Sequence, residues 1–319
     1  MTDLALPDGY DACNDYTRII VDEALARHVE VVILDPSTGE LELSHGGRTH
    51  VMIQSLSDLT SAVAHRRCDD KAMTRRVLVD AGLPVAPGRI ATGAEADAGF
   101  LAEHGSVVVK PCRGEGGAGI TVGVTEVDDL TAAVRTARES CTEVLLEAVV
   151  PGDDLRVLVI DDAVVAASIR RPPTVTGDGT STIRALIEAR NEARAARHGP
   201  AMVTPFDEIT TACLCAAGLT LDDVLDAGVE LQVRRTANLH TGGTIHDVTA
   251  ALHPSLADAA LRATAAVGLP VAGIDLMVPD PEGPEHVLIE VNEQPGLANH
   301  EPQPTAQRYL DLLFPETAT

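Results

Sequence analysis

The chain has 319 residues, 45% of them apolar, which is enough to bury a large core and excludes a disordered protein. Its 48 acidic residues outnumber its 24 basic ones, so the formal net charge is −24. Nucleic-acid backbones and anionic membranes attract basic surfaces, and we therefore expect neither as a partner.

The early elements alternate between helix and strand. Residues 17–35 read as a helix followed by a strand, and residues 41–53 read as a hairpin. We expect helices at Ser57–Cys68 and Lys71–Ala81, the second ending at Gly82, and a connector at residues 84–88. The alternation favours an α/β or α+β fold.

The later elements continue this alternation. Residues 90–146 pattern as a compact α/β unit, with helices at Ala94–Glu103 and Val127–Ser140 and strands at Val107–Val109, Ile120–Val124 and Val144–Leu146. Residues 155–169 read as two strands joined at Asp161. The remaining expected elements are helices at Ile183–Ala196, Leu219–Asp226, Pro304–Leu313 and from Pro254, and strands at Val271–Met277 and His286–Val291.

No targeting or membrane-spanning segment is evident. The sequence has no apolar run of about 18 residues, and its first residues lack the basic and apolar regions of a signal peptide. The six cysteines lack the paired spacing of a zinc site or a disulfide scaffold. These features predict reduced thiols and a cytoplasmic location.

Lysine usage is the most unusual feature of the composition. Lys71 and Lys110 are the only lysines among 24 basic residues. A lysine presents a compact ammonium, whereas arginine presents a planar fork, so the two are not interchangeable among phosphate oxygens. Either these two positions need an ammonium or the two lysines are there by chance.

A glycine-rich loop follows the second lysine. Four glycines, at positions 114, 116, 117 and 119, lie between two expected strands, and glycine lets a backbone approach phosphate closely. The loop is neither a P-loop nor a Rossmann loop, because no Gly-Lys-Ser/Thr and no helix follow. Its shape suits a flap that clamps a polyphosphate, and a mobile hairpin without a ligand remains the alternative.

Oxygen-bearing side chains gather near the end of the chain. Glu290 and Asn292 share one face of an expected strand, and Asp275 lies on another expected strand. Such hard oxygen ligands suit Mg²⁺ bound to nucleotide phosphates. A solvated strand face is the alternative, which the apolar residues at the alternating positions disfavour: Ile274, Leu276, Ile289 and Val291.

Two weaker patterns complete the candidate site. Glu147 ends an expected strand and Asp154 follows seven residues later, as in a hinge that could meet adenine and ribose, although a surface loop is the default interpretation. Several polar residues flank glycine turns and could bind an anion or form surface salt bridges: Arg156, Arg170, Arg171, Arg235 and Asn238.

The order of these features resembles the ATP-grasp superfamily of ADP-forming carboxylate–amine ligases. The resemblance covers roughly residues 55–319. Within the superfamily, this sequence most resembles the ATP-grasp parts of cyanophycin synthetase and N-acetylglutaminylglutamine amide synthetase. The stretches that carry it are CDDKAMTRRVLVDAGLPVAPG, VVVKPCRGEGGAGITVGV, RRPPTVTGDGTSTI, RRTANLHTGG, VAGIDLMV and VLIEVNEQPGLANHEPQP. The segment before residue 55 is short for the N-terminal region that helps such enzymes to choose a substrate, so substrate identity stays open.

The resemblance implies a fold with three parts. These are a short N-terminal α/β region at 1–65 on the substrate side, a mobile glycine-rich lid subdomain at 66–146, and a mixed-sheet C-terminal subdomain at 147–319. The last two would sandwich ATP.

The resemblance also implies a role for each candidate residue. Lys71, Lys110, Gly114, Gly116, Gly117 and Gly119 would bind the ATP phosphates, and Glu147 and Asp154 the adenine and ribose. Mg²⁺, with two ions expected and Mn²⁺ as the alternative metal, would be ligated by Asp275, Glu290 and Asn292. The catalytic residues would be Arg235, Asn238 and Lys110, and the substrate would contact Arg156, Arg170, Gly242 and Gly243.

The implied reaction joins a carboxylate to an amine through an acylphosphate. The acid would be an amino acid, an N-acyl amino acid or a glutamyl donor, the product a dipeptide or amide, and the enzyme a homo-oligomer, either dimer or tetramer. Two alternatives remain open at this stage: a kinase-like enzyme that stops at the phosphorylated substrate, and a nucleotide-binding module without catalysis. The complete set of metal ligands disfavours the module.

Overall fold

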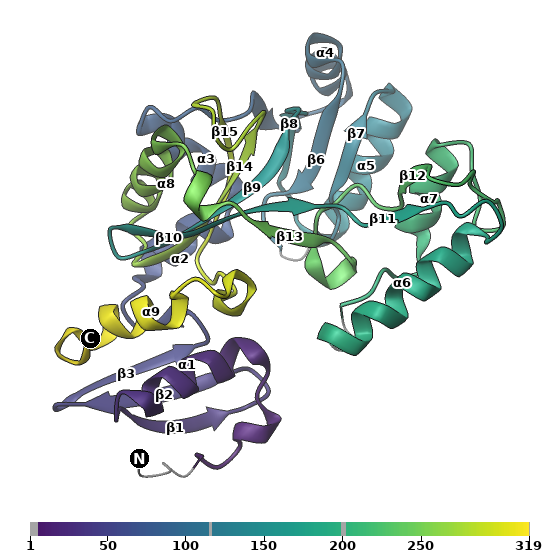
Figure 1. Ribbon diagram of the computed structural model, residues 1–319. Helices are drawn as coiled ribbons and strands as arrows, with labels where there is room; N and C mark the ends of the chain where they lie inside the picture. Colours follow the sequence, from purple (N-terminus) through teal and green to yellow (C-terminus); the bar gives the residue numbers. More distant parts are fainter. Residues whose placement is uncertain (1–5, 115–116, 199–201, 319) are drawn as a thin grey trace. The chain divides into compact units, whose positions relative to one another are not determined.

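A computed structural model describes residues 6–114, 117–198 and 202–318, with the side chains of residues 197 and 198 excepted. The chain forms two compact units (Figure 1). The first unit comprises Met1–Gly114, Gly119–Ser168 and Asp247–Thr319, and the second comprises Glu115–Ala118 and Ile169–His246. The three-part division expected from the sequence stays a prediction.

The first unit begins with an antiparallel sheet, the N-terminal sheet. Its strands follow one another in chain order: β1 (Glu30–Asp35), β2 (Glu40–His45), β3 (Arg48–Ile53) and β4 (Leu56–Ser57). Strands β2 and β3 confirm the hairpin expected at residues 41–53. Helix α1 (Asp15–Ala26) lies across this sheet and begins where the Asn14 side chain accepts a hydrogen bond from the Thr17 amide.

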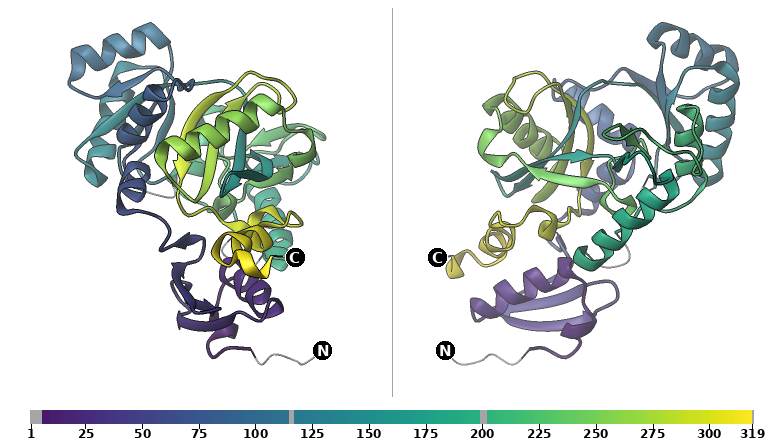
Figure 2. Two further views of the ribbon diagram at one scale, coloured as in Figure 1. Left: turned by 90° about the vertical axis from the view of Figure 1, so that its left-hand side faces the viewer. Right: turned by 45° about the vertical axis from the view of Figure 1, so that its right-hand side comes forward.

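Both ends of the chain contribute to one core in the first unit. Helix α9 (Thr305–Leu313) packs against α1, and Figure 2 shows the yellow C-terminal helix beside the purple N-terminal segment. Their buried side chains share a hydrophobic cluster that includes Ile20, Leu41 and Tyr309. This packing attaches the N-terminal sheet to the segment that follows the last strand of the chain.

A second antiparallel sheet, the middle sheet, has the strand order β5-β8-β6-β7. Its strands are β5 (Gly88–Ile90), β6 (Val107–Pro111), β7 (Thr121–Val124) and β8 (Val144–Ala148). Helices α4 (Ala94–His104) and α5 (Val127–Ser140) pack on it through a cluster that includes Phe100, Val109 and Leu130. The glycine-rich loop connects β6 to β7.

The third sheet has five strands in the order β13-β10-β9-β14-β15. Their bounds are β9 (Asp153–Ile160), β10 (Ala163–Arg171), β13 (Thr244–Asp247), β14 (Val271–Val278) and β15 (Val287–Asn292). Helix α8 (Pro254–Val267) packs on β9 and β14, and helices α2 (Ala62–Asp69) and α3 (Lys71–Asp80) pack on α8. Proline at the first position of α8 and Gly268 after its end are typical helix boundaries.

The second unit is smaller. It holds the strand pair β11 (Thr174–Thr176) and β12 (Glu230–Gln232) and the helices α6 (Ile183–His198) and α7 (Glu208–Ala216). Its core includes Val175, Ile183, Ile187, Leu214 and Leu225. The chain enters this unit along β10 and leaves it along β13.

Short 3₁₀ helices complete the described part of the chain. They lie at Tyr10–Ala12, Leu239–Thr241, Thr249–Ala251, Leu297–His300 and Pro315–Thr317. In the residues that the structure describes, no helix combines the length and apolar character needed to cross a membrane.

Two expectations about helices are wrong, and one about a connector differs at its last residue. Residues 219–226 form turns rather than a helix, because the Asp223 carboxylate binds the Thr220 amide at 2.7 Å and Val224 forms a bridge with Thr182. The helix expected from Ser57 begins at Ala62, since Ser57 pairs with Met52 in the sheet and Ser61 caps the helix. The connector expected at 84–88 ends in strand β5, which pairs with β8.

Candidate functional site

Lys110 and Glu147 form a buried ion pair in the middle sheet. Lys110 lies opposite Leu145 on the neighbouring strand, so Glu147, two residues further, shares its face of the sheet. The Lys110 ammonium contacts a Glu147 carboxylate oxygen, and each of the two residues is only 5% exposed. Arg75 of α3 lies 3.8 Å from the other Glu147 oxygen. The sheet register thus brings together two predicted residues that are 37 positions apart.

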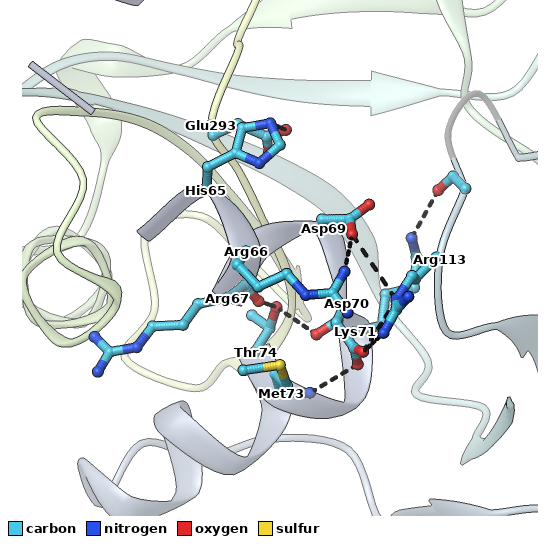
Figure 3. Close-up of polar contacts among 11 residues, drawn as sticks. His65, Arg66, Arg67, Asp69, Asp70, Lys71, Met73, Thr74, Arg113 and Glu293 are labelled. Carbon is cyan, nitrogen blue, oxygen red and sulfur yellow. Dashed lines mark hydrogen bonds and ion pairs between the residues drawn. The ribbon is translucent and has the colours of Figure 1, made fainter. Parts of the chain in front are cut away.

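Lys71 lies in the first turn of α3 and joins three segments of the first unit. Its ammonium donates a hydrogen bond to the Gly114 carbonyl at 3.0 Å and forms an ion pair with Glu290 of β15 at 3.0 Å. Its backbone amide donates to the Cys112 carbonyl at 2.8 Å. Helix α3, the start of the glycine-rich loop and strand β15 therefore meet at one buried lysine. Figure 3 shows Lys71 beside Asp70 and Arg113.

The three oxygen-bearing residues share one face of the five-stranded sheet. Asp275 of β14 lies opposite Glu290 of β15, and Asn292 lies two residues further along β15. The Asn292 amide nitrogen is 3.1 Å from the Gly273 carbonyl oxygen and 3.4 Å from an Asp275 oxygen. Their donor types suit Mg²⁺. Among the described residues, no cluster of three or more His, Cys, Asp or Glu side chains could hold a metal, so a metal here would depend on the Asn292 amide oxygen and on ligands from outside the chain.

Strand β9 adds two further predicted residues to this face. Arg156 lies opposite Asp275, and its guanidinium forks onto the Asp275 carboxylate, with one of the two contacts at 2.9 Å. Asp154 lies two residues earlier and so points to the same side of the sheet. The structure thus places Arg156, expected at the substrate, on a predicted metal ligand.

The predicted loop glycines are described in part. Gly114, Gly117 and Gly119 have φ values of +127°, +82° and +71°, a region in which residues with a side chain are strained. Gly116 lies outside the described residues. Beside the loop, burial raises the pKa of the Cys112 thiol to about 12.

The remaining predicted residues belong to the second unit. The Asn238 side chain accepts a hydrogen bond from the His240 amide at 2.8 Å and caps the 3₁₀ helix that precedes Gly242. A side chain at Gly243 would place its Cβ 2.8 Å from the Asn238 carbonyl oxygen, so this position requires glycine. Arg170 is half-buried at the end of β10, and Arg235 is exposed.

Sequence reasoning missed two arginines that hold this second-unit loop. Arg190 of α6 donates to the Gly242 carbonyl at 2.5 Å and to the Thr204 hydroxyl at 3.3 Å. Arg194, one turn later, donates to the Leu239 carbonyl at 3.5 Å and to the Met202 carbonyl at 2.9 Å. Burial lowers the pKa of both guanidiniums. Two arginines spaced four residues apart were the available signal, but carbonyl partners cannot be read from a sequence.

The chain is similar in sequence to known ATP-grasp proteins. The model of the prokaryotic glutathione synthetase ATP-grasp domain matches residues 83–197, and the model of the RimK-like ATP-grasp domain matches residues 219–306. The chain is 33% identical to a cyanophycin synthetase of Geminocystis herdmanii over 317 aligned positions, which cover 94% of this chain and 36% of that protein. It is 30% identical to a bifunctional glutathione biosynthesis protein of Streptococcus thermophilus, with 97% and 44% covered.

Solved structures give the same result. The bifunctional glutathione synthetase from Pasteurella multocida superposes with a TM-score of 0.67 at 26% identity, covering 96% of this chain and 44% of that one. The D-alanine–D-alanine ligase from Bacillus anthracis has a TM-score of 0.50 at 17% identity, covering 81% and 70%, and this shows similarity of fold alone. The chain spans less than half the length of the curated relatives described above.

Proposed function

Because the chain belongs to the ATP-grasp family, as the order of its sequence motifs predicted, we propose that it is an ATP-dependent ligase that joins a carboxylate to an amine. The observation that carries the proposal is the placement of the only two lysines. Each is buried and each is bound to a carboxylate, at a strand or helix that borders the glycine-rich loop. Buried ammonium groups beside such a loop are suited to phosphate oxygens.

The lysine contacts leave capacity for a nucleotide. An ammonium has three donor hydrogens, and within the described residues Lys71 donates one side-chain hydrogen bond, to the Gly114 carbonyl, while Glu290 lies 3.0 Å away as an ion pair. Donor capacity therefore remains for a phosphate oxygen. In this proposal Lys110 and Lys71 bind the ATP phosphates, and Glu147, which was expected at the adenine, also keeps the Lys110 ammonium oriented. Asp154 holds the ribose.

Asp275, Glu290 and Asn292 are the residues that would hold Mg²⁺, one or two ions, with Mn²⁺ as a substitute. When bound, the metal would neutralise charge on the phosphates. The carboxylate oxygens of Asp275 and Glu290 now contact Arg156 and Lys71. Arg156 and Lys71 therefore lie where positive charge is favoured. This supports a proposal in which Mg²⁺ binds the two carboxylates and the two cations contact phosphate instead.

The reaction would have two steps. A carboxylate oxygen of the acid attacks the γ-phosphorus of ATP, and the bond from this phosphorus to the β-phosphate oxygen breaks. The products of this step are ADP and an acylphosphate. The amine nitrogen then attacks the acyl carbon, phosphate leaves, and the nitrogen loses a proton to give the amide. Catalysis would come from positioning and charge neutralisation, with Arg235 and Asn238 proposed to bind the transferred phosphoryl group.

We propose an amino acid, an N-acyl amino acid or a glutamyl donor as the acid, bound through Arg156, Arg170 and the Gly242–Gly243 turn. We also propose a cytoplasmic location, because the spacing of the six cysteines in the sequence does not favour a disulfide scaffold. A dimer or tetramer stays a prediction, and light scattering would test it.

ADP release tests the proposed function. The protein is supplied with Mg²⁺-ATP and a panel of amino acids and N-acyl amino acids, singly and in pairs, and the products are weighed by mass spectrometry. We expect ADP release that requires one pair and a product with the mass of both partners minus water. Lys110→Arg is the control for a contaminating ATPase. Release with one acid and no amine would instead indicate a kinase-like reaction, and no release with any pair would contradict the proposal.

A further inference from the structure

Arg113, the last residue before the first loop glycine, is bound to the N-terminus of α3. Its Nε and Nη2 atoms lie 3.3 Å and 3.2 Å from the Asp70 Oδ2 atom, and Nε lies 3.8 Å from Asp69 (Figure 3). The Asp70 side chain is 6% exposed and the Arg113 side chain 43% exposed. The pair thus anchors a partly exposed arginine to a buried carboxylate.

Asp70 divides its two oxygens between two tasks. Its Oδ1 atom accepts a hydrogen bond from the Met73 amide at 3.2 Å and so caps α3, whereas Oδ2 binds Arg113. The same aspartate therefore links the start of the helix that carries Lys71 to the start of the glycine-rich loop.

Three consecutive loop residues are tied to the two residues at this helix start. The Cys112 carbonyl accepts from the Lys71 amide, the Arg113 side chain binds Asp70, and the Gly114 carbonyl accepts from the Lys71 ammonium. Gly114 has a φ of +127°. Glycine adopts this conformation readily but is also free to leave it, because it has no side chain to restrict its backbone. Its carbonyl can orient Lys71 only if a neighbouring residue holds the loop in place.

We propose that the Asp70–Arg113 ion pair is a positioning device, which holds residues 112–114 on α3 and thereby orients the Lys71 ammonium for a nucleotide phosphate. The inference rests on the proposed function, because Lys71 is taken to bind phosphate. Arg113 acts through Gly114 and Lys71 and is a positioning residue. The alternative is that Arg113 binds phosphate itself, in which case Asp70 competes with the nucleotide for it.

The test compares Arg113→Met with Arg66→Met. Arg66 is a matched control because its side chain is 44% exposed and pairs with Asp69 at 2.6 Å in the same region. Asp70→Asn removes the charge but keeps an Ncap side chain, since asparagine caps helices as well as aspartate. Three readouts are measured: hydrogen exchange of a peptide that contains the Lys71 amide without nucleotide, the Kd for Mg²⁺-ADP, and the KM and kcat for ATP.

We expect Arg113→Met and Asp70→Asn each to accelerate exchange at Lys71 and to raise the Kd and the KM about fivefold, with little change in kcat. The double variant should be no worse than either single variant, because both remove one interaction. Arg66→Met should match the wild type in all three readouts.

Several outcomes would overturn the inference. Exchange at Lys71 that is unchanged in Arg113→Met would show that the pair does not hold the loop, whatever the protein does with ATP. Tighter Mg²⁺-ADP binding by Asp70→Asn would show that Arg113 serves the phosphate directly. If the wild type neither binds Mg²⁺-ADP nor turns over ATP, the proposed function fails, and faster exchange in the two variants would then establish the anchor alone.

Discussion

The two units hold their candidate site residues by different interactions. In the first unit the candidate site cations are matched to carboxylates, in the pairs Lys110–Glu147, Lys71–Glu290 and Arg156–Asp275. In the second unit the cations Arg190 and Arg194 contact backbone carbonyl oxygens, and Asn238 caps a short helix. In the first unit these contacts balance charge. In the second unit they maintain the conformation of a loop.

This difference has a physical consequence. A buried ion pair is costly to break from one side, because the remaining charge is left without compensation. An arginine that donates to carbonyl oxygens leaves neutral groups behind when it is removed, and these cost less. We therefore expect the candidate site of the first unit to be sensitive to changes of charge, and the loop at Asn238–Gly243 in the second unit to be sensitive to the loss of hydrogen-bond donors.

The largest effect is expected at Lys110. Lys110→Met should lower the free energy of unfolding by about 3 kcal/mol, because Glu147 would remain buried and charged with only Arg75 of the described residues, 3.8 Å away, to compensate it. Lys110→Arg should fold but lose about 100-fold or more in turnover, since a guanidinium cannot replace the ammonium among phosphates. Denaturant unfolding and ADP release measure the two effects.

A double variant separates stability from activity at this pair. Lys110→Met with Glu147→Gln should recover most of the stability but none of the turnover. Recovery of turnover would show that Lys110 serves only to neutralise Glu147 and does not bind phosphate.

The next effect concerns the metal. Glu290→Gln should raise the Mg²⁺ concentration that gives half-maximal activity by about tenfold or more, because a charged ligand becomes neutral. Glu285→Gln, at an exposed position in the turn before β15, removes the same charge and should leave the Mg²⁺ dependence unchanged. Equal Mg²⁺ dependence in the two variants would argue against a metal at this face.

In the second unit, Arg190→Met should cost about 1–3 kcal/mol of stability, because the Gly242 carbonyl and the Thr204 hydroxyl lose a donor. We expect kcat/KM to fall about tenfold if the loop contacts the substrate, since misplaced binding groups lose rate. Arg184→Met is the control, because Arg184 lies on the same helix with its side chain 45% exposed. Equal losses of stability and of kcat/KM in Arg190→Met and Arg184→Met would mean that the loop does not depend on Arg190.

The smallest effect is a difference in thiol reactivity between the units. Because burial raises the pKa of Cys112 to about 12, this thiol stays protonated at pH 8 and should resist alkylation in the folded protein. Cys215 of α7 is exposed and should react first. Mass spectrometry after a brief iodoacetamide pulse reads both. Rapid labelling of Cys112 would indicate that the first unit opens locally near the glycine-rich loop.

The parts of the site that could be predicted are those that short sequence patterns specify. The alternation around Glu290 and Asn292 indicates a shared strand face, and the register of β14 and β15 agrees with it. Contacts between distant positions could not be predicted: Arg113 binds Asp70, which lies 43 positions away, and Arg190 binds Gly242, which lies 52 positions away. Neither partner type is implied by the local pattern.

The expected helix at residues 219–226 shows the same limit for secondary structure. Its leucines have helical spacing, but Leu225 is buried in the core of the second unit while Thr220 and Asp223 bind each other. Local side-chain hydrogen bonds and the bridge between Val224 and Thr182 outweighed the spacing.

The sequence by itself determined the chemical types in this protein: two lysines, a glycine-rich loop and oxygen-bearing residues at strand spacing. It also determined the family, because these features occur in the family's order. Only the tertiary structure decided which charges meet, such as Lys110 with Glu147 and Lys71 with Glu290. The physical reason is that strand periodicity is local, whereas the pairing of charges depends on the register of strands and helices from distant parts of the chain.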